Sequence, residues 1–109
     1  MEPIHKNLAS GNWQKLSLFE QLGNIGSEVG RARSWRGRDE KNFSGAVDRA
    51  LELFDLTIAD ARWKDRLREI LRAREFFCDA VFGKGEYGNS LEDLEKYFLQ
   101  FAIAARLQR

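Results

Sequence analysis

The 109-residue chain contains one cysteine, one proline and one histidine, and each shortage excludes something. With Cys78 alone, no intramolecular disulfide can form, and we expect a reducing, cytoplasmic location. Cys78 and His5 together cannot supply the four nitrogen and sulfur ligands of a structural zinc site. Because Pro3 is the only proline, no proline interrupts a helix after it.

Long apolar runs are also missing from the sequence. No run approaches the roughly 18 residues of a membrane span, so we expect neither a signal peptide nor a membrane partner. The composition, 43% hydrophobic and 32% charged, is typical of a folded globular protein rather than a disordered one. At this length we expect a single domain with one core.

Positive charge is concentrated in residues 31–38, where four arginines surround one tryptophan in a chain of net charge +1. Arginine interleaved with tryptophan is what a phosphate-binding or base-stacking surface needs. The same bases in the last turns of a helix also favour its dipole and reach its free carbonyls, so both interpretations stay open. The candidate polyanion or partner contacts are Arg31, Arg33, Trp35, Arg36 and Arg38, with a basic row of Lys64, Arg68 and Arg72.

Apolar residues recur at helical spacing through most of the chain, and no strand pattern is found. The pattern predicts helices over about residues 17–35, 40–59, 62–82 and 90–107, after an irregular N-terminal segment, residues 1–16. Short connections predict an antiparallel up-down-up-down four-helix bundle. We expect Ser17 with Glu20, Asp39 and Ser90 to cap helix starts, and Trp13 to pack against the body.

Three glycines, Gly23, Gly26 and Gly30, lie inside the first predicted helix. Each costs about 1 kcal/mol relative to alanine in a helix interior. Their presence therefore indicates either that another backbone approaches closely or that the helix bends. Gly37 is placed to end this helix.

The last predicted helix carries more apolar surface than one core would cover. Besides its core stripe, it has a second ridge made of Leu99, Ile103 and Leu107. Such a ridge needs a partner, which we expect to be either the N-terminal segment or another subunit.

Arg74 falls in the centre of the apolar stripe expected on the third helix. A buried guanidinium must be paired. Counting residues outward from the turns of an antiparallel bundle puts Asp48 and Glu28 at the same level, so we expect Arg74 to bond to one of them. The alternative is a binding arginine on an interface.

The sequence contains no convincing motif for an enzyme active site or a metal site. Residues 83–88 match G-x-G-x-x-G, but a dinucleotide site needs a preceding strand, so we interpret them as a helix–helix turn. A carboxylate metal site in a bundle needs inward glutamates with histidine partners, which are lacking. Cys78 lies on an apolar face, where a thiol behaves as a small hydrophobe. We expect no catalytic residues, no metal and no cofactor.

Residues 24–31, Asn-Ile-Gly-Ser-Glu-Val-Gly-Arg, resemble the Asn-Ile-Ala-Glu-Gly-x-Gly-Arg pattern of a family of small four-helix bundles. This family includes proteins encoded in intervening sequences of large-subunit ribosomal RNA genes and accessory proteins of diversity-generating retroelements. Asn24, Ile25, Gly30 and Arg31 match the pattern, whereas Ser27 and Glu28 depart from it. The resemblance covers about residues 18–56 and implies a non-enzymatic bundle that self-associates and contacts nucleic acid through basic residues.

Together these features predict a soluble, all-α, non-catalytic interaction module that forms homo-oligomers. The first alternative is a nucleic-acid-binding accessory protein that uses the arginine and tryptophan residues at the end of the first helix. The second is a small-molecule-binding bundle, which would require an apolar cavity with a few polar groups; the sequence itself does not indicate such a ligand.

Overall fold

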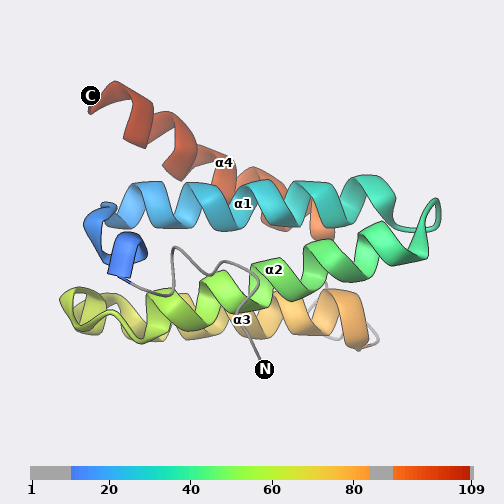
Figure 1. Ribbon diagram of the computed structural model, residues 1–109, viewed down its shortest axis with the longest axis horizontal. Helices are drawn as coiled ribbons and strands as arrows, with labels where there is room; N and C mark the ends of the chain where they lie inside the picture. Colours follow the sequence, from blue (N-terminus) through green and yellow to red (C-terminus); the bar gives the residue numbers. More distant parts are fainter. Residues whose placement is uncertain (1–10, 84–89, 109) are drawn as a thin grey trace.

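The protein is an all-α, antiparallel four-helix bundle, as predicted (Figure 1). The computed structural model describes residues 11–83 and 90–108, and no strand occurs among them. The four long helices are α1 (Leu18–Trp35), α2 (Glu40–Ile58), α3 (Leu67–Phe82) and α4 (Leu91–Leu107). Two short 3-10 helices, η2 (Trp13–Lys15) and η3 (Ala61–Arg66), precede α1 and α3.

The predicted caps set the helix starts. At α1 the Glu20 amide donates to Ser17 Oγ at 3.1 Å and the Ser17 amide donates to Glu20 Oε1 at 3.0 Å, which completes a capping box. The side chains of Asp39 and Ser90 accept amide hydrogen bonds at the starts of α2 and α4. Gly37, at φ +76°, makes the turn after α1 that a residue with a side chain adopts with difficulty.

Large aromatic side chains fill the core where α2, α3 and α4 meet. The ring of Phe54 lies 5.9 Å from that of Phe77 and 5.8 Å from that of Phe98, and all three are fully buried. Burying one such side chain contributes roughly 2–3 kcal/mol. These rings also hold the three helices apart, because side chains of this size need wide interhelical spacing.

The contact between α1 and α4 is much closer, and the glycines of α1 make it possible. A Cβ added at Gly23 would lie 3.1 Å from Ala102 Cα, and one at Gly26 would lie 2.5 Å from Phe98 Cβ. At Gly30 it would collide with the carboxylate of Glu95. The close approach predicted from these glycines is therefore confirmed, and α4 is the helix that approaches.

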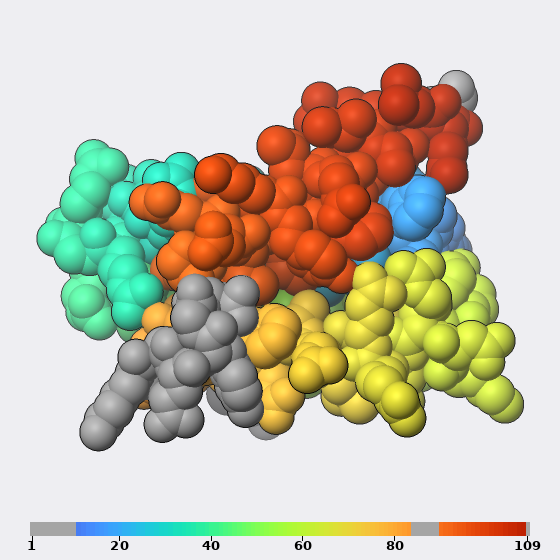
Figure 2. Space-filling model, turned by 180° about the vertical axis from the view of Figure 1, so that it is seen from behind, coloured from blue at the N-terminus to red at the C-terminus, as the bar shows by residue number. Residues whose placement is uncertain are grey.

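The C-terminal half of α4 contacts α1 at Ala102, and beyond this contact its end projects from the bundle. In Figure 1 it rises away from α1, and Figure 2 shows from the opposite side that the red end stands clear of the body. Beyond Phe101, the only residue of α4 classed as buried in the described part is Ala105. This half of the helix is supported on one side only.

The predicted start of the third helix is wrong by about five residues. Residues 61–66 form the 3-10 helix η3, and Trp63 has non-helical angles of φ −103° and ψ 21°. Asp60 caps η3 by accepting a hydrogen bond from the Arg62 amide, and the Trp63 ring donates to Gln21 of α1. These contacts hold the segment in a tight turn, so the α-helix begins only at Leu67.

Within the segment predicted to be irregular, residues 1–16, the described residues include the short 3-10 helix η2. Trp13 is fully buried, as expected, and it begins the single turn of η2. The predicted glycine-rich turn lies outside the described residues except for Gly83, as does the segment before residue 11.

We expect Gly26→Ala to destabilise the protein by up to about 2 kcal/mol. The helix-propensity gain of about 1 kcal/mol is outweighed by overpacking against Phe98, which typically costs about 1–3 kcal/mol. Urea unfolding followed by circular dichroism measures the change.

Gly45→Ala in α2 is the matched control, because an added Cβ there meets only the side chain of Arg49, at 3.2 Å from Nη1, and no atom of another helix. We expect this variant to equal or exceed the wild-type stability. A Gly26→Ala protein as stable as Gly45→Ala would contradict the close α1–α4 contact.

Candidate functional site

The arginines at the end of α1 fall into two pairs: one pair forms ion pairs with acids, and the other lies near aromatic rings. Arg31 forms an ion pair with Glu28 on its own helix. Arg33 Nε reaches Glu95 Oε1 of α4 at 2.5 Å, and this hydrogen bond raises the pKa of the Arg33 guanidinium. These two charges are therefore neutralised within the protein.

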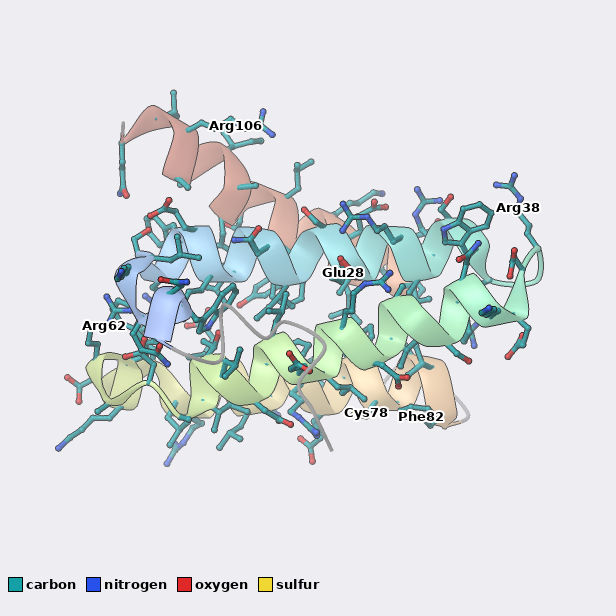
Figure 3. The ribbon with its side chains drawn as sticks, in the orientation of Figure 1. Glu28, Arg38, Arg62, Cys78, Phe82 and Arg106 are labelled. Carbon is teal, nitrogen blue, oxygen red and sulfur yellow. The ribbon has the colours of Figure 1, made fainter. Side chains whose placement is uncertain are left out.

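The other pair is exposed at the α1–α2 turn. The guanidinium of Arg36 lies 5.8 Å from the centre of the Phe43 ring, and that of Arg38 lies 5.6 Å from the Trp35 ring. Within residues 11–83 and 90–108, neither arginine forms an ion pair with an acid. Figure 3 shows Arg38 pointing outward at this end of the molecule.

The basic row of α3 does not extend this corner. Lys64, Arg68 and Arg72 are all exposed. Lys64 belongs to η3, which carries Arg62, and Figure 3 places Arg62 at the opposite end of the bundle from Arg38. Nucleic-acid binding through these residues therefore stays a prediction. The basic residues proposed for it lie partly at the α1–α2 turn and partly along η3 and α3.

The predicted partner of Arg74 is wrong. Arg74 Nε donates to Asp55 Oδ1 of α2 at 3.1 Å, rather than to Asp48 or Glu28, and its side chain is about one-third exposed. The reason is the rotation of α3: its buried residues are Ile70, Ala73, Phe77 and Ala80. Arg74 therefore lies at the edge of the buried face instead of its centre.

Glu28 is a buried carboxylate, and its ion-pair partners are two arginines other than Arg74. Its carboxylate accepts from Arg49 Nε of α2 at 2.7 Å and from Arg31. In Figure 3, Glu28 points from α1 toward α2. Two guanidiniums compensate one buried carboxylate, so this group ties α1 to α2 and is not left free for chemistry.

A buried polar network at the other end of the bundle was not predicted from the sequence. Gln21, which is fully buried, donates through Nε2 to the Trp13 carbonyl at 2.9 Å and to Asp60 Oδ2 at 3.1 Å. Its Oε1 accepts from Trp63 Nε1 at 2.9 Å. The Trp13 indole in turn donates to Thr57 Oγ1 at 3.0 Å. One glutamine thus joins η2, α1 and η3.

Asp60 supplies the charge of this network. Hydrogen bonds from the Arg62 guanidinium lower the pKa of the Asp60 carboxyl from 3.8 to about 2, against the opposing effect of burial. Arg62 also donates to the Leu16 carbonyl at 2.8 Å and lies 4.3 Å from the centre of the Trp63 ring. Every strong polar group in the network is already bonded, so the arrangement is a structural clasp and offers no free acid or base.

A second perturbed pair links α3 to α4. The Tyr97 hydroxyl donates to Glu69 Oε1 at 2.7 Å. Burial raises the pKa of Tyr97, and the hydrogen bond from Tyr97 lowers the pKa of Glu69, with Arg66 adding to that effect. Sequence spacing does not reveal this pair, because its members come from different helices.

The second ridge of α4 is exposed. Leu99, Ile103 and Leu107 expose 51%, 46% and 82% of their surface, and the exposure is greatest at Leu107, near the projecting end of the helix. Two further large apolar side chains, Leu71 and Phe82 on α3, are also exposed.

The described residues show no metal site and no reactive free thiol on the open surface. No group of three or more potential ligands gathers there to hold a metal ion. Cys78 is half-buried, and Arg74 Nη1 lies 3.7 Å from its sulfur. None of the helices in residues 11–83 and 90–108 is long and apolar enough to cross a bilayer.

No protein-family model, curated protein or solved structure matches this chain. The resemblance of residues 24–31 to the bundle family of ribosomal RNA intervening sequences stays a prediction.

The clasp around Asp60 makes stability depend on pH. Because the pKa of Asp60 in the folded state lies below its unfolded value of about 3.9, the stabilisation is complete above about pH 4 and is lost as the pH falls toward 2. We expect Asp60→Asn to cost about 1.5–3 kcal/mol at pH 7 and to flatten the acid limb of the stability profile.

Asp65→Asn is the control, since Asp65 is an exposed acid of the same 3-10 helix. Urea unfolding at a series of pH values should give wild-type behaviour for this variant. Equal acid sensitivity in the Asp60→Asn and wild-type proteins would show that the clasp does not carry the charge assigned to it.

Proposed function

We propose that this chain is a homo-oligomeric interaction module that self-associates through the projecting half of α4. The observation that carries this proposal is the exposed ridge of Leu99, Ile103 and Leu107. Three aliphatic side chains aligned on a helix that is supported from one side only form a continuous exposed apolar surface. Covering such a ridge removes apolar area from water and is the main driving force of association.

A second copy of the chain fits the chemistry of this surface. Residues 99–105 of α4 carry no charge. In an antiparallel pair of α4 helices related by a twofold axis at Ile103, Leu99 of each copy faces Leu107 of the other. The surface is therefore complementary to itself in hydrophobicity, and pairing it desolvates no charged side chain between residues 99 and 105.

The ridge alone is small for a permanent dimer. Stable interfaces bury about 800 Å² on each partner, more than three partly exposed side chains supply. We therefore expect a concentration-dependent association in which residues flanking the ridge also take part.

We expect Ile103→Glu to yield a monomer, because it puts two like charges into an apolar contact between the copies. Light scattering at increasing protein concentration measures the average mass, and circular dichroism checks that the variant is folded.

Leu71→Glu is the matched control, since Leu71 on α3 is 45% exposed, almost the same as Ile103. This variant should associate like the wild type. The proposed interface would be wrong if both substitutions dissociated the protein equally, or if the wild type stayed monomeric at every concentration.

A further inference from the structure

The close contact between α1 and α4 has a consequence on the other side of α4. Gly23 and Gly26 let α4 settle against α1, whereas Phe77 of α3 and Phe98 of α4 each pack against Phe54 of α2. α4 therefore packs mainly on α1 and only loosely on α3, and a groove lies between α3 and α4.

This groove has the size and lining of a small ligand site. It is half-open, has a volume of about 350 Å³, and lies between α3 and α4. Its apolar lining comes from Ala73 and Phe76 of α3 and Leu94 and Tyr97 of α4. Small-molecule pockets typically begin at about 300 Å³ and combine apolar walls with a few polar groups.

Three charged side chains line the groove, and two of them are compensated. Glu69 accepts from the Tyr97 hydroxyl, and its carboxylate lies 2.9 Å from the Arg66 guanidinium. Asp93 lies in the first turn of α4, where the helix dipole favours its negative charge.

Arg72 is the third charged group. It lies with its guanidinium 5.8 Å from the centre of the Phe76 ring and makes no ion pair with any acid in the described part of the chain. A guanidinium binds carboxylate and sulfonate groups with two parallel hydrogen bonds. Arg72 is therefore the positive lining group that an anionic ligand can reach, beside the carboxylates of Glu69 and Asp93.

We propose that the α3–α4 groove binds a small organic anion that contains an apolar ring. The ring lies among Ala73, Leu94 and Tyr97, and the anionic group binds Arg72. None of the ridge residues lines this groove, so ligand binding here can be tested independently of self-association.

8-Anilinonaphthalene-1-sulfonate is a suitable probe, because it joins an apolar ring system to one sulfonate. N-Phenyl-1-naphthylamine has the same ring system without the charge. Fluorescence titrations with both probes measure affinity, and ¹H–¹⁵N NMR spectra locate the bound molecule. The protein used is the full chain carrying Ile103→Glu, so that binding of either probe at the α4 ridge is suppressed.

We expect saturable binding of the sulfonate, with NMR shifts concentrated at Ala73, Leu94 and Tyr97. Arg72→Gln should weaken the sulfonate about tenfold and leave the affinity for the uncharged probe within about twofold. Arg68→Gln, one turn earlier on α3 and outside the groove, should leave both affinities unchanged.

Three results would each overturn the proposal. The first is an absence of saturable binding. The second is a set of NMR shifts spread over the surface or confined to other helices. The third is an equal loss of sulfonate affinity in the Arg72→Gln and Arg68→Gln proteins. It would show that the sulfonate is attracted by the positive surface of α3 in general and not by Arg72.

Discussion

The close contact between α1 and α4 is the constraint on which the rest of the architecture depends. The glycines of α1 remove the side chains that would hold α4 away, and Phe98 and Ala102 of α4 occupy the space. Because α4 packs mainly on α1 and only loosely on α3, one helix of the bundle is held tightly on one side and loosely on the other. The half-open α3–α4 groove and the one-sided support of the C-terminal half of α4 both follow from this asymmetry.

Polar contacts stabilise the remaining junctions. Glu28 and Arg49 join α1 to α2 near the middle of the bundle, and Gln21 with Asp60 joins the N-terminal turn to η3. Glu28, Gln21 and Asp60 are buried and hydrogen-bonded to groups on other elements, so these contacts favour one arrangement of the helices. Exposed surfaces of the described residues include the ridge of α4, the α3–α4 groove and the turn between α1 and α2.

Sequence reasoning predicted what local chemistry determines. Helix spacing, the Ser17 capping box and the turn at Gly37 depend on residues a few positions apart, and all were predicted correctly. The face of α3 that is buried was not predicted correctly. Leu67, Leu71 and Cys78 are more hydrophobic than Ala73 and Ala80, so the sequence pattern favoured the wrong face. Arg74 was misplaced as a result. Contacts such as Gln21 with Asp60 join residues that only the finished fold brings together, so no spacing rule reveals them.

The central claim is that the ridge left free by the α1–α4 contact binds a second copy of the chain. Isotope-filtered NMR on an equal mixture of ¹³C-labelled and unlabelled protein tests it most directly, because it detects only contacts between different copies. The account predicts intermolecular nuclear Overhauser effects among the methyl groups of Leu99, Ile103 and Leu107. Intermolecular contacts confined to Leu71 and Phe82 of α3, or none at millimolar concentration, would contradict it.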